Sequence, residues 1–287
     1  MTDPPNTAVL SPGVSKRLIA FACAVALVNG MSFTLIFPIM PDLLLSIGAA
    51  DYTQAARYGG YLVTAFAIAH LLSTPVLGGI ADAYGRRPLI LLGLASSVIV
   101  NLVFAIAGQT WIFILCRVFG GLSAASDLAL TSSLADVSEP QDRARLFGYV
   151  TASNSLGMIM GPAIGGALGA FDLRAPFVLM AVLKGVLVLY AVVFIRETLH
   201  RDDRRAFELR RANPIGVIEG QLSNGLNPAY LVYVTCLVFG IAGLFYVGPY
   251  YLGLRFGWGP REIGYTLGLI AIVAIFVQTV FLSLVRR

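Results

Sequence analysis

Eight apolar runs dominate this sequence, and each is long enough to cross a lipid bilayer as a helix. That crossing takes about 20 apolar residues, and in lipid only helices and closed barrels satisfy their backbone hydrogen bonds. Charged residues are 12% of the chain, about half of what is usual in a soluble domain. The sequence therefore predicts an all-α membrane protein with eight transmembrane helices, at residues 18–40, 59–80, 89–108, 111–134, 146–169, 176–195, 229–252 and 263–285.

The basic residues predict how these helices are oriented. With both termini in the cytoplasm, 14 Lys and Arg residues fall in the inner segments and four in the outer ones, namely Arg57, Arg174, Arg255 and Arg261. An excess of positive charge on the cytoplasmic side is typical of membrane proteins. The net charge of +5 therefore reflects topology, and we expect no nucleic-acid partner.

The remaining sequence signals argue against an enzyme or a cofactor protein. Cys23, Cys116 and Cys236 all lie in apolar runs, which predicts neither a disulfide framework nor a metal site. There is no Walker-type phosphate loop, so ATP is not expected as a partner. The first 17 residues lack the short apolar core and cleavage site of a signal peptide, so we expect the first span to direct insertion.

A long polar stretch divides the predicted spans into two groups. We expect residues 1–17 to be a cytoplasmic tail, 18–195 a bundle of six helices, 196–228 a cytoplasmic linker and 229–287 a partial second bundle. The linker holds six Arg and five acidic residues, which favours a solvated or lipid-facing strip with a surface helix around 202–211. This organisation is typical of half of a repeated architecture followed by a fragment of the other half.

Glycines recur every fourth residue in the fifth run, at Gly157, Gly161, Gly165 and Gly169. This spacing places them on one face of a helix, where a second helix can approach closely. Pro162 removes one intrahelical hydrogen bond and is expected to bend the helix. A bent helix with a glycine face predicts a hinge between bundles that move against each other.

The turn between the second and third runs has a specific pattern. Its small, acidic and basic residues keep a fixed spacing, at Gly78, Asp82, Gly85, Arg86 and Arg87. Glycine permits a tight turn, and Pro88 suits the first turn of the following helix. The two arginines could simply set topology, but the whole spacing is far more specific than that requires.

With these motifs, the sequence resembles the major facilitator superfamily and, within it, the drug–proton antiporters related to tetracycline exporters. The turn is similar to the family signature between helices two and three, although Ala83 replaces a usual basic residue. Arg117 and Gly121 resemble the Arg-x3-Gly motif of helix four. The fifth run resembles the antiporter signature of helix five, at Gly157, Gly161, Pro162, Gly165 and Gly166.

The resemblance implies twelve helices in two halves around a central cavity, of which this chain would hold the first six, the linker and helices seven and eight. It implies a secondary active transporter of the bacterial inner membrane that exports a small amphipathic molecule in exchange for protons by alternating access. It also implies that helix five packs beside helix eight, near Gly264 and Gly268. Two alternatives remain open: a fragment that does not transport, and a carrier of the same fold for a metabolite.

In the family, a charged cluster at the cytoplasmic ends of helices two to four acts as a conformational latch. Such a network suits a switch, because rocking the bundles breaks and remakes it. Static structural pairing is the alternative. The residues in question are Gly78, Asp82, Gly85, Arg86, Arg87 and Asp136.

Two charged residues inside the fourth run are candidates for proton coupling. Arg117 would lie roughly 9 Å deep, and the resemblance implies that it biases the protonation of a nearby carboxylate; snorkelling to the interface is the alternative. Asp127 is a carboxylate inside a span, which suits a proton carrier, although it could instead pair with cytoplasmic arginines. Ten residues of continuous helix turn about 280°, which predicts different faces for Arg117 and Asp127.

Other polar and aromatic residues within the spans are weaker candidates. His70 could titrate or be a neutral core residue, and Lys184 is an unusual residue for which the sequence offers no account. Asn29 stands where tetracycline exporters tend to carry an aspartate, so Asp127 or His70 is expected to carry the proton instead. Asn29, Phe33 and Tyr149 are the candidates for lining the cavity.

Overall fold

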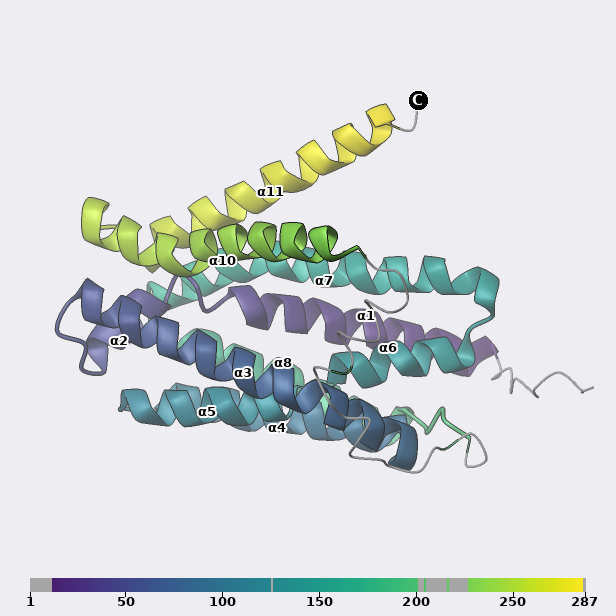
Figure 1. Cartoon of the computed structure of the whole chain (residues 1–287). Helices are drawn as coiled ribbons and strands as arrows, with labels where there is room; N and C mark the ends of the chain where they lie inside the picture. Colours follow the sequence, from purple (N-terminus) through teal and green to yellow (C-terminus); the bar gives the residue numbers. More distant parts are fainter. Residues whose placement is uncertain (1–11, 125, 201–203, 205–215, 217–226, 286–287) are drawn as a thin grey trace, which may run out of the picture.

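The computed structural model describes residues 12–124, 126–200, 204, 216 and 227–285. These residues form a bundle of helices and contain no strand (Figure 1). The surface helix expected around 202–211 lies outside the described residues, apart from Arg204. The helices are α1 (Pro12–Thr34), α2 (Met40–Ser46), α3 (Tyr52–Tyr84), α4 (Arg86–Ile106), α5 (Thr110–Leu122), α6 (Ser126–Val137), α7 (Pro140–Gly169), α8 (Ala175–Phe194), α10 (Pro228–Phe256) and α11 (Pro260–Val285).

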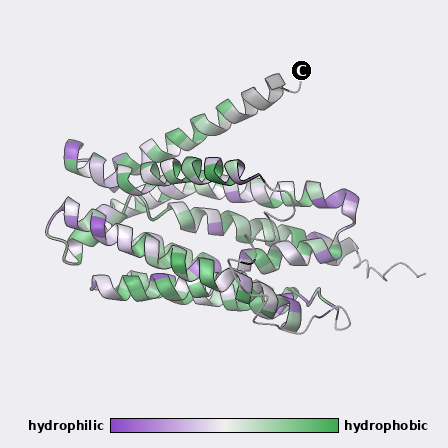
Figure 2. Cartoon of the chain, in the orientation of Figure 1, coloured by the Kyte–Doolittle hydropathy of each residue, from purple (hydrophilic) through white to green (hydrophobic). Residues whose placement is uncertain are grey.

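The chain is an all-α, multi-pass membrane protein. Figure 2 shows that hydrophobic residues dominate the helices, while hydrophilic residues gather near many of their ends. The total of eight transmembrane helices stays a prediction. Two of the helices that it counts, α7 and α11, are not among the described segments that are long and apolar enough to cross a membrane. Six described segments do meet these requirements: Lys16–Thr34, Tyr52–Tyr84, Arg86–Ile106, Thr110–Val137, Ala175–Phe194 and Pro228–Phe256.

The first predicted span is shorter than expected. A single helix over 18–40 is wrong, because α1 ends at Thr34 and α2 begins only at Met40. Pro38 and Pro41 lack the N–H group that would donate to the carbonyl four residues earlier. Two prolines so close together interrupt the helical hydrogen-bond ladder and separate α1 from α2.

The fourth predicted span is also interrupted. A single helix over 111–134 is wrong, because α5 ends at Leu122 and α6 begins at Ser126. Near the end of α5 the carbonyl oxygen of Gly121 accepts a hydrogen bond of 2.9 Å from the Ser73 hydroxyl of α3. A β-carbon at Gly121 would have no room against α3. A tertiary contact between backbones therefore lies next to the point where the helix breaks.

The buried core consists of two clusters. The first gathers around residues such as Leu35, Phe113 and Phe177 and includes Tyr250 of α10 and Ile263 of α11. The second has its buried residues in α1, α3, α4, α6 and α8 and at Ile195 after α8, and it has none in α10 or α11. The last two helices are thus attached near one end of the bundle, and α11 extends away from it (Figure 1).

The glycines of α7 serve two different neighbours. β-Carbons at Gly157, Gly161 and Gly165 would collide with backbone or Thr34 atoms of α1 and the turn after it. A β-carbon at Gly166 would lie 2.8 Å from the Cα atom of Gly264 in α11. The predicted contact between α7 and α11 is therefore confirmed. The groove formed by every fourth glycine is filled by α1, from the same group of six spans.

Candidate functional site

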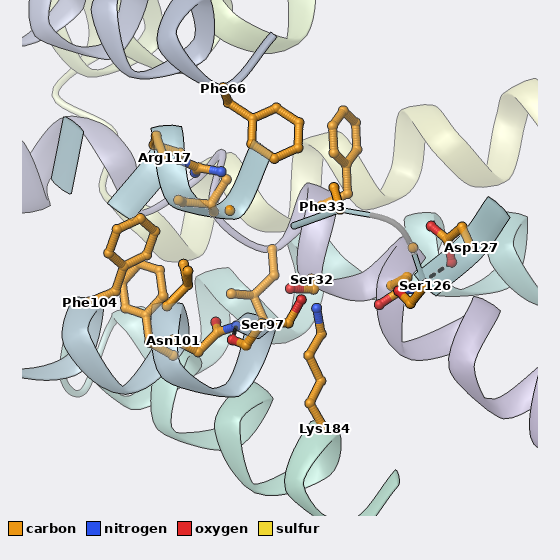
Figure 3. Close-up of a pocket in the computed structure, with 18 of the residues that line it drawn as sticks. Ser32, Phe33, Phe66, Ser97, Asn101, Phe104, Arg117, Ser126, Asp127 and Lys184 are labelled. Carbon is orange, nitrogen blue, oxygen red and sulfur yellow. Dashed lines mark hydrogen bonds between the residues drawn. The ribbon is translucent and has the colours of Figure 1, made fainter. Parts of the chain in front are cut away.

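A cavity of about 410 Å³ lies between the helices of the first bundle. Aromatic and aliphatic side chains form part of its wall, and hydroxyl, amide and charged groups form the rest (Figure 3). A cavity that mixes apolar walls with a few polar groups is typical of small-molecule sites. The charged and polar side chains on the wall are Asn29, Ser32, Ser97, Asn101, Arg117, Ser126, Asp127, Asn154 and Lys184.

Several residues singled out in the sequence meet at this cavity. Asn29, Phe33, Arg117 and Asp127 all line it. Arg117 and Asp127 were predicted to lie on different faces of one helix, which would keep them out of a common site. Both residues nevertheless line the same cavity. The premise of a continuous helix fails at the break between α5 and α6.

Asp127 lies in the first turn of α6. The side-chain amide of Asn29 donates a hydrogen bond of 2.6 Å to its carboxylate. Asp127 lines the cavity but is exposed, although it lies within an apolar span. Asn29 therefore stands beside this carboxylate as a hydrogen-bond donor.

Arg117 is held by aromatic rings. Its guanidinium carbon lies 5.3 Å from the ring centre of Phe104 and 6.0 Å from that of Phe66, within the range of cation–π attraction. None of the ion pairs among the described residues involves Arg117, and its Nε atom has no hydrogen-bond partner there. A charged arginine within a membrane would favour an acidic or carbonyl partner. Here the rings of Phe104 and Phe66 take part of that role.

Lys184 enters the cavity from the middle of α8. Its residue is 5% exposed, and Figure 3 shows its side chain pointing into the pocket on the side of Ser32 and Ser97. Its amine forms no ion pair or hydrogen bond with any residue that the structure describes. The sequence showed only a lysine in a strongly apolar helix. The structure shows that this lysine lines the cavity.

His70 and Tyr149 are placed elsewhere. The His70 ring stacks on Phe66 with 5.6 Å between ring centres, and its Nδ1 atom has no partner among the described residues. It does not contribute to the wall of the cavity. Tyr149 is exposed on α7 and does not line the cavity either.

A second polar site, the Arg86 cluster, joins the ends of α3, α4, α6 and the segment after α8. We define it as Asp82, Arg86, Asp136 and Glu197. Arg86 lies 2.5 Å from the carboxylate of Asp82 and 3.3 Å from that of Asp136. Arg87, next to it, donates a hydrogen bond of 2.8 Å to the carbonyl oxygen of Val192. The three residues expected to meet here are therefore together.

Glu197 is the member that the sequence did not reveal. Its carboxylate accepts hydrogen bonds from the backbone N–H groups of Arg86 at 2.8 Å and Arg87 at 3.1 Å, at the start of α4. A negative charge there is favoured by the helix dipole and by the free N–H groups. Gly85 has a φ of +110°, and a side chain on it would collide with Glu197. The expected solvated strip is thus wrong for Glu197, which is half-buried.

The bundle, its central cavity and the Arg86 cluster agree with a match to a known family. The sequence model of the Major Facilitator Superfamily matches residues 22–287. The chain belongs to this family. A solved structure of a bacterial homologue of the human lysosomal transporter Spinster, inward-facing and unoccupied, superposes with a TM-score of 0.75. At 18% identity, covering 93% of this chain and 61% of that one, it shows the same fold.

This member of the superfamily is also similar to curated resistance proteins. The class C tetracycline resistance protein of Escherichia coli is 32% identical over 87% of this chain and 62% of its own length. Multidrug resistance protein 2 of Bacillus subtilis is 29% identical over 85% of this chain and 60% of its own length. The chain thus spans about 60% of these relatives. Membership in a family of transporters agrees with the prediction that the chain is not an enzyme.

Proposed function

We propose that this chain forms part of a proton-coupled exporter of small amphipathic molecules, in the bacterial inner membrane with its termini in the cytoplasm. The observation that carries the proposal is the cavity, which brings Asp127 together with aromatic rings and polar groups. Similarity to proteins named for tetracycline and multidrug resistance supports efflux as the direction.

Asp127 is the proposed proton carrier. Its exposure gives water access to the carboxylate, and the side-chain amide of Asn29 donates a hydrogen bond to it. Binding a proton would weaken that hydrogen bond and change the charge of the cavity by one unit. Arg117, on the same cavity wall, is the proposed partner of Asp127 in proton coupling. His70 is the second candidate for the proton.

Two other features support alternating access. The Arg86 cluster, with Gly78, Gly85 and Arg87, is the proposed latch, because its ion pairs join several helix ends. The antiporter signature in α7 is the proposed hinge, with Gly166 against Gly264 of α11 as the contact between the two groups of helices. We retain 18–195 as the first bundle and 196–228 as the linker in this proposal.

The test measures proton release from everted membrane vesicles on addition of tetracycline. We expect Asp127→Asn to reduce substrate-driven proton release at least about tenfold, as is usual for loss of a positioned proton-transfer group. Asp142→Asn is the matched control, because Asp142 is an exposed carboxylate outside the cavity, 3.1 Å from Arg145. Full coupling in both Asp127→Asn and His70→Gln would overturn the proposed proton site. No tetracycline-dependent proton release from the parent chain would overturn the proposed exchange.

A further inference from the structure

The cavity holds more positive than negative charge. Arg117 and Lys184 contribute two cations to its wall, and Asp127 is its one described carboxylate. That carboxylate is hydrogen-bonded to Asn29 and forms no ion pair with either cation. The wall therefore has an uncompensated positive charge in the part of the chain that the structure describes.

Lys184 is the more costly of the two cations. Removing an ammonium group from water without an ionic partner costs several kcal/mol, and charged residues within a membrane usually mark a ligand or ion path. Arg117 recovers part of this cost from Phe104 and Phe66. Lys184 has no such aromatic contact, so its amine is the cation left for a ligand.

The groups around Lys184 suit an oxyanion. Ser32 of α1 and Ser97 and Asn101 of α4 line the same cavity and are neutral. Asn101 is 7% exposed and donates a hydrogen bond of 2.8 Å to the backbone carbonyl of Ser97. Hydroxyl groups can donate to a carboxylate held by the lysine. The described carboxylate whose charge acts on the amine is Asp127, which forms no ion pair with it.

We propose that the cavity selects the anionic form of an amphipathic molecule, with a carboxylate or a comparable oxyanion bound by Lys184. The apolar part of the ligand would lie against Phe33, Phe66 and Phe104, which line the same cavity. This inference rests on the proposed function, because it names the substrate class of the proposed export cavity.

The test uses three fluorescent probes of matched size with the full 287-residue chain, purified in an uncharged detergent without added lipid so that no headgroup competes. Dansylglycine is the anion, dansylglycinamide the neutral probe and dansyl-ethylenediamine the cation. We expect dansylglycine to bind at least about tenfold more tightly than either of the others, the range of one charge-assisted hydrogen bond.

Three variants separate recognition from folding. Lys184→Met should weaken dansylglycine binding at least about tenfold and leave dansylglycinamide within about twofold, whereas Lys184→Arg should retain most of the anion affinity. Lys16→Met is the matched control, because Lys16 is exposed and outside the cavity.

Equal affinity of the parent chain for the three probes, or no binding of dansylglycine, would overturn the inference. So would an unchanged anion affinity in Lys184→Met, or equal losses for the anionic and neutral probes. Failure of the proposed function is a separate outcome, because it is read from tetracycline-driven proton release in vesicles. Export without any preference for the anion would keep the proposed function and reject the role of Lys184.

Discussion

The Arg86 cluster and the cavity hold the same kinds of charged group in one bundle, but their charges are satisfied differently. Arg86 has two carboxylate partners, and Glu197 accepts from the first N–H groups of α4. In the cavity, neither Arg117 nor Lys184 forms an ion pair with a described residue. One site therefore joins helix ends, and the other leaves charge free for a ligand.

The difference follows from the cost of burying charge. A charge with good partners recovers its desolvation energy within the protein, so removing one partner is destabilising. A buried charge without a partner lowers the stability of the fold, so its replacement by an apolar side chain is neutral or stabilising. Stability measurements on the two sites should thus give opposite signs, and the following variants test that comparison.

Arg86→Met should have the largest effect on stability. It leaves the carboxylates of Asp82 and Asp136 without their shared cation, and we expect the free energy of unfolding to fall by about 2 kcal/mol, since partial exposure reduces the cost of a fully buried pair. Thermal unfolding in detergent measures it. Arg145→Met is the control, because its pair with Asp142 is exposed and should be worth less than about 0.5 kcal/mol. Equal losses of stability in both variants would show that the ion pairs of Arg86 stabilise the fold no more than an exposed pair does.

Glu197→Ala should have the next largest effect. The first N–H groups of α4 lose their acceptor, which should lower the free energy of unfolding by about 1.5 kcal/mol, as for the loss of a helix cap. Amide hydrogen exchange at Arg86 and Arg87 should become faster, while exchange in the middle of α4 should change little. Unchanged exchange at both amides would show that Glu197 does not cap this helix.

Lys184→Met should act in the opposite direction. Replacing an unpaired buried ammonium by an apolar side chain of similar length should raise the free energy of unfolding by about 1 kcal/mol. The same unfolding assay in detergent measures the change. A loss as large as that of Arg86→Met would mean that Lys184 has a structural partner, and the contrast between the two sites would fail.

The smallest effect concerns the rings around Arg117. A double-mutant cycle with Phe104→Leu and Arg117→Met should give a coupling energy of about 0.5–1 kcal/mol for the contact at 5.3 Å. A parallel cycle with Phe113→Leu is the control, because that ring stacks on Phe104 and forms no described cation–π contact. A coupling energy of zero between Phe104 and Arg117 would leave the guanidinium as unsupported as the Lys184 amine.

Much of the fold was predictable from local sequence. The apolar runs predicted the helices α3, α4, α8 and α10, and most of their ends lie within a few residues of the predicted ones. This succeeded because a long helix in lipid needs only a continuous apolar segment. The interruption after Thr34 was readable from Pro38 and Pro41, whose effect is local. The break after Leu122 was not readable, since it lies beside a contact between Gly121 and α3.

The candidate site was predictable only in part. Asp127, Arg117 and Asn29 stood out as polar residues in apolar runs, and they do line the cavity. Glu197 was missed because it lies 111 residues from Arg86 in the sequence and follows the last span of the bundle. Lys184 stood out as unusual, but no pattern in α8 indicated that it faces a cavity.

The resemblance to the family implied the pairing of α7 with α11. The sequence by itself determined the class of protein, the positions of most helices and the family motifs. These depend on hydropathy, on glycine spacing and on residues close together in the chain. The tertiary structure alone decided which charges have partners, because ion pairs and cavity walls depend on distances between residues far apart in sequence. It placed Arg86 between two carboxylates and left Lys184 facing a cavity without an ion pair to any described residue.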